Sequence, residues 1–513
     1  MSAENVLFIL TDQWPATAFS FCEADRALRQ RSGSALTTAA PKQRSGSAST
    51  IATPNIDRLA AEGTVFSNAF TTCPLCTPAR GTLLTGRWPH ETGITDNYAV
   101  GYSQQVSPPL TERTWIDEAA RLGYHVGYFG KWHLGPVNPQ ARGAHRFDPN
   151  AELLRQPYDP ETSNFSYQFA KGNYDRQTRG LIRGRAPFWG DTAQPKEECP
   201  PFPVMENGVR FLEEWAAGDR SKPFFLTVSS AEPHFPHHLP EPYTSLAQEL
   251  RAKVELPVNL SDNCAGRPWF HAVAWWPCMD TSPLDEEEWR TVVAYSHAHI
   301  TMVDEAIGRV LDALEWLGLR ESTTVVFVAD HGDMEGAHNR FDKGAYFYEE
   351  VWRIPLIIRA PGREPAAQDT FVSLIDVGET LFGLINAAAT AEKPRAGRDL
   401  LPLVGTGTRP ADWSQTAFGV YNLYNGMNFA VRAIRNERYK YVWNPQAIDE
   451  LYDLEADPHE MENLTAEPGL AAVKAELRQQ LMDWLAEIDD DLPSRAGQLP
   501  PAGTIMATGE AGP

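Results

Sequence analysis

Short apolar runs alternate with helical patterns along most of the chain, and this alternation limits the possible folds more than any other feature. Runs typical of buried strands lie at residues 5–10, 124–129, 223–230, 323–329 and 354–359. Helical patterns lie around residues 54–63, 111–122, 205–217 and 285–318. Strands separated by helices usually pair in parallel, with helices over both faces. We therefore predict an α/β fold with a large mixed, mostly parallel sheet sandwiched by helices.

The pattern changes after residue 405. Short strand-like runs with hairpin-length gaps, and then a helical pattern, lie at residues 418–423, 429–435, 438–443 and 470–487. They predict a small antiparallel sheet with one helix. The sequence thus divides into an N-terminal α/β domain at 1–405 and a smaller α+β domain at 406–513. The Pro-, Gly- and Ala-rich tail after Asp491 is expected to be loose.

Composition excludes several classes of protein. With 42% hydrophobic residues in 513, the chain can bury a large core. Its net charge of −22 argues against nucleic-acid binding. The longest apolar runs are about five residues, whereas a membrane span needs about twenty. The N-terminal apolar run is too short for the core of a signal peptide and no basic region precedes it, so we expect a cytoplasmic protein. A homo-oligomer is left open.

One segment shows no apolar periodicity. The sequence Q-R-S-G-S-A occurs at residues 30–35 and again at 43–48. The surrounding residues 22–50 are rich in Ser, Ala and Gly, which predicts a flexible surface insertion.

Cys76 begins the most informative segment of the chain, C-T-P-A-R-G-T-L-L-T-G-R. Thr77 can cap a helix that Gly86 ends. Cys76 would then lie at a helix N-terminus, where the dipole favours anions, and Arg80 could reach the same point. Two other interpretations remain open: a buried structural cysteine, or a C-x-x-C redox pair with Cys73.

Five motifs, in this order along the chain, resemble those of the type I sulfatases. They are N-V-L-F-I-L-T-D-Q at 5–13, C-T-P-A-R with T-G-R at 76–87, G-K-W-H-L-G at 130–135, A-D-H-G-D with K-G at 329–344, and L-Y-D-L, D-P and N-L at 451–464. The C-x-P-x-R signature of this family directs conversion of its cysteine to formylglycine, and only Cys76 has the required Pro and Arg. The resemblance implies an alkaline-phosphatase-like fold and hydrolysis of an aryl or carbohydrate sulfate monoester.

Sulfate esters need a strong nucleophile, because sulfur carries charged oxygens and the leaving group is poor. The resemblance implies that Cys76, as formylglycine, supplies it. A hydrated aldehyde carries two hydroxyls on one carbon: one can attack sulfur, and the other can expel sulfate afterwards. The expected partners are a small sulfated substrate and, during maturation, a formylglycine-generating enzyme.

A divalent metal site is implied at the strand ends, where ligands of parallel sheets gather. The resemblance points to Asp12, Gln13, Asp330 and His331, together with an oxygen of formylglycine at Cys76. Many family members carry Asp in place of Gln13, and often Asn in place of His331. A mostly oxygen donor set favours Ca²⁺, with Mn²⁺ and Mg²⁺ as alternatives.

Lys131 and His133 alternate at a predicted strand end and would share a face if the segment stayed extended. By resemblance, Lys131 binds sulfate or the formylglycine hydroxyl. His133 would act as the general base for sulfate release, which suits a group with a pKa near neutrality. The alternative is an ordinary surface pair.

Three further residues complete the implied site. His234, in the segment E-P-H-F-P, would contact or protonate the leaving oxygen. Lys343 would place a second cation on the sulfate and could serve as the acid instead. Arg80 would orient formylglycine and neutralise charge beside the metal.

The substrate is not specified by these motifs. Residues 137–200 and 237–283 and the C-terminal domain vary in the family, and the aromatic segment at 268–277 could line a pocket or pack on the core. Two other functions stay open: a phosphonate monoester or phosphodiester hydrolase of the same superfamily, and an inactive anion-binding relative.

Overall fold

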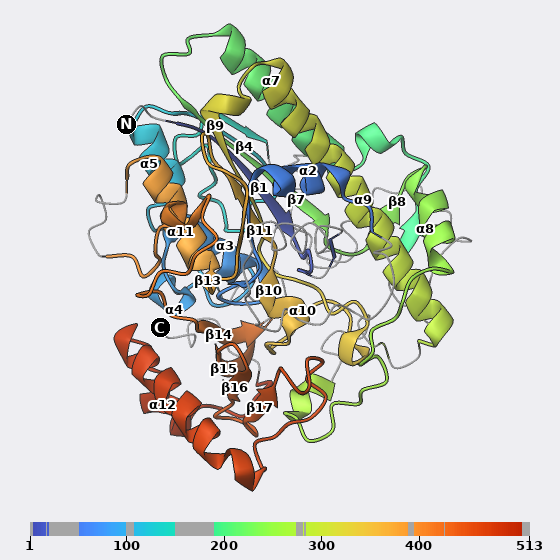
Figure 1. Ribbon diagram of the computed structural model, residues 1–513, viewed down its shortest axis with the longest axis vertical. Coiled ribbons are helices and arrows are strands. Elements are labelled where there is room, and N and C mark those ends of the chain that lie inside the picture. The colour runs from blue at the N-terminus through green and yellow to red at the C-terminus, as the bar shows by residue number, and fades with distance from the viewer. Residues whose placement is uncertain are drawn as a thin grey trace.

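Figure 1 shows a sheet through the middle of the molecule with helices on either side. The computed structural model describes residues 4–16, 18–19, 51–98, 107–148, 189–272, 281, 284–387, 394–424 and 426–504. The repeated segment within 22–50 lies outside these ranges. The main sheet has the spatial order β12 (Ala366–Gln368), β2 (Thr64–Phe66), β11 (Leu356–Arg359), β9 (Thr323–Ala329), β1 (Asn5–Asp12), β7 (Phe224–Pro233), β4 (His125–Gly130) and β5 (Arg146–Asp148).

The centre of this sheet is parallel. β1 pairs in parallel with β7 on one side and with β9 on the other, and β4 pairs in parallel with β7. β11 runs antiparallel to β9 and makes the sheet mixed. The predicted fold class is confirmed.

Alternate residues of β1 face opposite helix layers, as the side chains of a strand must. Leu7 and Ile9 belong to one hydrophobic core, whereas Val6 and Phe8 belong to the other. The first core is covered by α2 (Pro54–Glu62), α7 (Phe202–Ala217), α8 (Tyr243–Arg251) and α9 (Glu286–Trp316). The second is covered by α3 (Cys76–Thr85), α5 (Trp115–Arg121) and α11 (Leu374–Leu384). The sheet is therefore buried on both faces.

Local signals explain where the helices start. Asp285 caps α9: its carboxylate accepts from Glu288 N at 2.9 Å, and Glu288 Oε2 accepts from Asp285 N at 2.9 Å. Thr53 lies at the N-cap position of α2, as predicted, but its hydroxyl donates to Asp57 instead of accepting a backbone N–H. None of the helices within the described ranges is long and apolar enough to cross a membrane.

Smaller sheets flank the main one. Their strands are β3 (Ala69–Phe70), β10 (Arg353–Ile354) and β13 (Val372–Ser373) in one sheet, and β6 (Trp189–Asp191) and β8 (His237–Leu239) in another. The short helices α4 (Pro89–Thr92) and α10 (Glu349–Trp352) join neighbouring segments. The predicted single strand at 354–359 is broken at Pro355, which has no N–H to donate, so Ile354 and Leu356 belong to different sheets.

The C-terminal part forms an antiparallel sheet at the lower end of the view in Figure 1, with α12 (Ala471–Glu487) beside it. Its strands are β14 (Ala417–Tyr424), β15 (Met427–Arg435), β16 (Tyr439–Trp443) and β17 (Glu450–Asp453). Leu477, Leu481 and Leu485, one turn apart on α12, are buried against this sheet. The small sheet with one helix is confirmed, whereas β17 was not predicted as a strand. The domain boundary at 405/406 stays a prediction.

The prediction of a loose tail after Asp491 is wrong for residues 492–504. Leu492 begins the short helix α13 (Leu492–Arg495) and is fully buried. Farther on, Asn428 N donates to Thr504 O and Gly503 N donates to Asn428 O, both at 2.9 Å. These backbone hydrogen bonds and the buried leucine order a segment that its composition alone had indicated to be loose.

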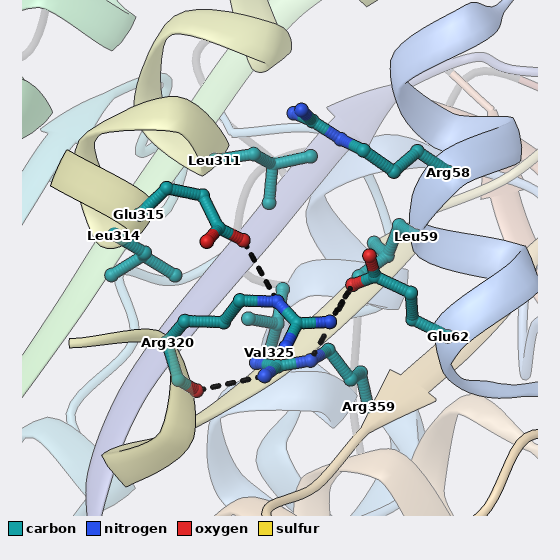
Figure 2. Close-up of a pocket in the computed structure, with 9 residues that line it drawn as sticks. All are labelled: Arg58, Leu59, Glu62, Leu311, Leu314, Glu315, Arg320, Val325 and Arg359. Carbon is teal, nitrogen blue, oxygen red and sulfur yellow. Dashed lines mark hydrogen bonds and ion pairs between the residues drawn. The ribbon is translucent and has the colours of Figure 1, made fainter. Parts of the chain in front are cut away.

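A network of ion pairs lies at the end of the sheet where β9 starts (Figure 2). Arg320 Nη2 lies 2.9 Å from Glu62 Oε2, and its Nε lies 2.7 Å from Glu315 Oε1. Arg359 Nη2 donates to the Arg320 carbonyl at 2.8 Å. The pocket these side chains line, which includes Val325 at the start of β9, lies at the opposite end of the strand from Asp330. Its guanidinium groups tie α2, α9 and the sheet together.

Acid should weaken the packing of β8 on α9. Nδ1 of His237 lies 3.1 Å from Nδ1 of His299, and both side chains are buried. Burial, and then the charges of His238 and His234, lower the pKa of His299 to about 3, and burial also lowers the pKa of His237. The unfolded chain therefore binds protons that the folded chain rejects, so this stability is present above pH 6.5 and is lost as the pH falls.

We predict that each of these two histidines costs about 1.4 kcal/mol of unfolding free energy at pH 5.5 relative to neutral pH. In His299→Gln, the loss of stability between pH 7.5 and 5.5, measured by urea unfolding, should shrink by about that amount. His145→Gln, at an exposed histidine, is the control. An unchanged pH slope in His299→Gln would contradict the assignment.

Candidate active site

Four neighbouring parallel strands end at one edge of the sheet, and each brings one charged or titratable side chain there. Asp12 is the last residue of β1, and Asp330 directly follows β9. Lys131 follows β4, and His234 follows β7. Asp12 and Asp330 are more than 300 positions apart in sequence, yet the register of the parallel strands places all four residues at the same edge of the sheet.

Cys76 is the first residue of α3, as expected, but Thr77 is not its cap. The N-cap position is Leu75, and the left-handed Gly86 (φ 66°) ends the helix. Asn97 performs the capping, since its Oδ1 accepts from Thr77 N at 3.0 Å. The Thr77 hydroxyl instead donates to the His133 carbonyl at 2.8 Å. The helix start is thereby tied to the loop that follows β4.

Four potential metal ligands converge at Cys76. Ligand atoms of Asp12, Cys76, Asp330 and His331 all lie within 4.8 Å of one another, and all four residues are buried. Cys76 Sγ is 3.2 Å from His331 Nε2 and 3.7 Å from Asp12 Oδ1. The structure thus brings together the predicted cysteine and three of the four protein side chains predicted to bind the metal.

Arg80 holds the two carboxylates from the far side. Its Nε donates to Asp330 Oδ2 at 2.8 Å, and its Nη2 donates to Asp12 Oδ2 at 3.1 Å. The Oδ1 atoms of both carboxylates are then left on the side of His331, at 3.8 and 4.0 Å from its Nε2. This fork geometry orients two hard oxygen ligands toward one point.

The ring of His331 is also oriented by a hydrogen bond. Its Nδ1 lies 2.9 Å from the Gly332 carbonyl, so Nδ1 carries the proton and Nε2 faces the carboxylates. Burial disfavours the imidazolium, yet the negative charges of Asp330 and Cys76 raise the pKa of His331 to about 9. Burial, and then the charge of Asp12, raises the pKa of Asp330. The cluster thus attracts positive charge, and its two carboxylates and one imidazole suit a divalent cation.

Gln13 reaches this cluster by another route. Its backbone N donates to Asp330 Oδ1 at 3.1 Å, from a left-handed conformation (φ 61°). Its side-chain Oε1 accepts from Lys343 Nζ at 2.7 Å, while its Nε2 donates to Asp333. Asp333 therefore fixes which end of the amide faces the site. Sequence reasoning did not single out Asp333, although it ends the D-H-G-D segment.

Lys131 and His133 do not share the face of an extended strand. Gly130 and His133 both have positive φ angles, 95° and 57°, so the chain turns as soon as β4 ends. Lys131 Nζ nevertheless pairs with Asp12. Burial of the His133 ring lowers its pKa, and the negative charges of Cys76 and Asp12 offset part of that effect. The expectation of an extended segment was wrong, although Lys131 still reaches the cluster through Asp12.

His234 and Lys343 form a pair beside the cluster. His234 Nε2 lies 2.7 Å from Lys343 Nζ, and its Nδ1 lies 2.6 Å from the Phe235 carbonyl. Since Nδ1 faces an acceptor, it carries the proton, and Nε2 accepts from the ammonium group. Lys343 also pairs with Asp342 at 2.9 Å. The pair is joined to Asp330 through Gln13.

Cys73 has a different environment from Cys76. Both are buried and neither forms a disulfide within the described residues. Burial, and then the charge of Asp96, raises the pKa of Cys73. For Cys76, Lys131 and Lys343 outweigh burial and the charge of Asp12, and the pKa is lowered. The pKa values of the two thiols are thus shifted in opposite directions, and the thiolate is favoured at Cys76.

Comparison with known proteins identifies the family of this chain. Residues 4–387 match the family model described as Sulfatase. This chain belongs to the sulfatase family. Residues 336–487 match the model described as N-sulphoglucosamine sulphohydrolase, C-terminal. The sulfatase is 32% identical over 521 residues to the "uncharacterized sulfatase YidJ" of Escherichia coli (strain K12), with 98% of this chain and 91% of that protein covered.

Solved structures share the fold. One, described as a complex with its substrate D-glucosamine-2-N,6-O-disulfate, has a TM-score of 0.68 and 22% identity over 96% of this chain and 99% of the other. The phosphonate monoester hydrolase of Agrobacterium radiobacter has a TM-score of 0.69 and 23% identity over 94% and 96%. The alkaline-phosphatase-like architecture predicted from the motifs is confirmed. The chain is a sulfuric ester hydrolase that acts on a sulfated substrate.

Asp12→Asn and Asp330→Asn should each lose bound divalent metal together with activity, since each removes charge from a hard oxygen ligand. Metal content per folded chain, measured by inductively coupled plasma mass spectrometry, should fall from stoichiometric to trace levels. Asp304→Asn is the matched control, because Asp304 is equally buried but bonds the start of α2. Stoichiometric metal in both site variants would place the metal elsewhere.

Proposed function

We propose that the protein hydrolyses aryl or carbohydrate sulfate monoesters with a formylglycine formed from Cys76 and one divalent cation. Ca²⁺ is the favoured ion, with Mn²⁺ and Mg²⁺ as alternatives. The observation that supports this most is the position of Cys76. It begins a helix within 4.8 Å of two carboxylates and an imidazole, with the ammonium groups of Lys131 and Lys343 near enough to lower its pKa. A formylglycine-generating enzyme would be the partner in maturation.

Cys76 Sγ stands where the oxygens of the hydrated aldehyde would lie. Formylglycine supplies a nucleophile with two hydroxyls on one carbon, and the metal supplies positive charge for the sulfate oxygens. Asp12, Asp330 and His331 would hold the metal, with Gln13 Oε1 as a further oxygen donor. Arg80 keeps both carboxylates turned toward it.

Lys131 and His133 would have different roles in catalysis. Lys131, paired with Asp12, places a cation at the rim of the cluster and would bind the sulfate group. His133 is neutral near neutral pH because burial lowers its pKa, so its ring can accept a proton. The charge of Cys76 acts on the His133 ring, which would place this base beside the group that must be deprotonated to release sulfate.

The leaving oxygen needs a proton from another side. Lys343 carries that proton in the His234–Lys343 pair, because Nε2 of His234 accepts from it. We therefore assign leaving-group protonation to this pair, with Lys343 as the donor and His234 as the group that holds it. His234 follows β7 and Lys343 lies in the loop after β9, whereas His133 lies in the loop after β4.

A phosphonate monoester or phosphodiester hydrolase activity is the second candidate. It is favoured by the fold shared with the Agrobacterium radiobacter enzyme and by Gln13 in place of a second carboxylate. Parallel assays of nitrophenyl sulfate and a phenyl phosphonate ester distinguish the two. We expect the larger kcat/KM for the sulfate, and a larger value for the phosphonate would overturn the primary proposal.

Cys76→Ala should lower kcat by at least about 1,000-fold with nitrophenyl sulfate, because it removes the nucleophile. Cys73→Ala should keep most of the activity. Circular dichroism of both variants checks that the fold is intact. A retained rate in Cys76→Ala, or equal loss in both variants, would contradict the mechanism and restore the C-x-x-C alternative.

The variants His133→Ala and Lys343→Met should fail differently across a series of aryl sulfates. Loss of Lys343 should cost about tenfold more for poor leaving groups than for nitrophenolate, because poor leaving groups need the proton most. Loss of His133 should leave kcat/KM unchanged and bring kcat to one common low value for all leaving groups, since His133 acts after the leaving group has departed. Brønsted plots of kcat/KM and kcat measure this. Identical leaving-group dependence in both variants would show that the roles are misassigned.

A further inference from the structure

Tyr128 and Ser229 lie behind the site and contact no group assigned to bind sulfate except through the backbone of Lys131. We propose that they are positioning residues, which fix the main chain of Lys131 so that its ammonium group reaches Asp12. This inference rests on the proposed role of Lys131 in sulfate binding. Neither residue belongs to a motif that pointed to the family.

The Lys131 carbonyl is held by three donors. Tyr128 Oη donates to it at 2.8 Å, Ser229 Oγ at 2.9 Å and Arg80 Nη1 at 3.1 Å. On its other side, Lys131 N donates to the Ser229 carbonyl at 2.8 Å. Both backbone polar groups of one catalytic lysine are therefore fixed, and Ser229 takes part in both contacts.

The turn before Lys131 needs such restraint. Gly130 has a φ of 95°, and a Cβ there would lie 2.0 Å from the Ser229 carbonyl oxygen, so the turn is pressed against β7. A lysine side chain has four flexible carbons, and only its backbone can be held rigidly. Fixing the carbonyl sets the direction of the Cα–Cβ bond, and with it the region that the ammonium group can reach.

Arg80 couples this restraint to the metal ligands. Its Nη1 donates to Ser229 Oγ at 2.8 Å as well as to the Lys131 carbonyl, while its other nitrogens bind Asp12 and Asp330. One guanidinium group thus orients the two carboxylates and the main chain of the sulfate-binding lysine together. Ser229 and Tyr128 are buried, with 0% and 2% of their surface exposed, so they act from behind the reacting atoms.

Tyr124 provides a matched control. It lies next to the same strand as Tyr128 and is equally buried, at 2%. Its hydroxyl has no hydrogen-bond partner within the described part of the chain. Tyr124→Phe and Tyr128→Phe therefore remove the same atom from similar surroundings, and only the second loses a contact with Lys131.

The test compares Tyr128→Phe, Ser229→Ala and Tyr124→Phe in the wild type and in a Lys131→Met background, with nitrophenyl sulfate as substrate. In the wild type, Tyr128→Phe and Ser229→Ala should each lower kcat/KM about tenfold and weaken inhibition by inorganic sulfate, because the ammonium group is displaced. Tyr124→Phe should change kcat/KM less than twofold. In Lys131→Met, Tyr128→Phe and Tyr124→Phe should each cost less than twofold, since the residue through which Tyr128 acts is gone. The loss from Ser229→Ala should shrink there to the part that comes through its bond with Arg80.

Two results would overturn the inference. The first is a result in which Tyr128→Phe and Ser229→Ala each lower kcat/KM by the same factor in Lys131→Met as in the wild type. Equal factors in both backgrounds would indicate a general structural defect that is independent of Lys131. The second is no loss from either in the wild type. If Lys131→Met itself keeps the wild-type kcat/KM, the proposed role of Lys131 is wrong and the inference falls with it, which separates that failure from the other two. Melting temperatures show that the compared chains are folded.

Discussion

The guanidinium group of Arg80 between the buried carboxylates of Asp12 and Asp330 is the interaction on which the rest of the site depends. All three side chains are at most 1% exposed. Two carboxylates buried at one point would repel each other, and removing one partner from a buried ion pair costs about 3–5 kcal/mol. Arg80 offsets that repulsion on one side, and on the other it leaves two oxygens facing His331. Because these two oxygens face His331 and not Arg80, the arrangement favours binding of a second cation beside His331.

The parallel sheet makes this arrangement possible. β9, β1, β7 and β4 are neighbours that run in the same direction, so the residues at their carboxyl ends meet at one edge. Helix α3 then brings Cys76 and Arg80 to that edge from one face of the sheet. Because both faces carry a packed core, the strand ends have little freedom to move, and the polar groups keep their distances.

Much of this could be predicted from sequence, for identifiable reasons. Buried strands read as apolar runs, and each motif residue stands directly at the end of one, so Asp12, Lys131 and Asp330 were placed correctly. Contacts set by backbone turns could not be predicted. The positive φ of His133, the cap supplied by Asn97 in place of Thr77, and the pairing of Asn428 with the tail depend on tertiary neighbours. Tyr128 and Ser229 carried no signal beyond their positions near strand ends.

The central claim is that Cys76 becomes the catalytic aldehyde, and the mass of the peptide that contains it tests this most directly. Protein purified in active form is digested with trypsin, and the Cys76 peptide is compared with that of the same chain expressed without a formylglycine-generating enzyme. The account predicts that the active sample is lighter by the exchange of sulfur for oxygen and the loss of two hydrogens, in proportion to its specific activity. A fully active sample in which Cys76 remains a thiol would contradict it.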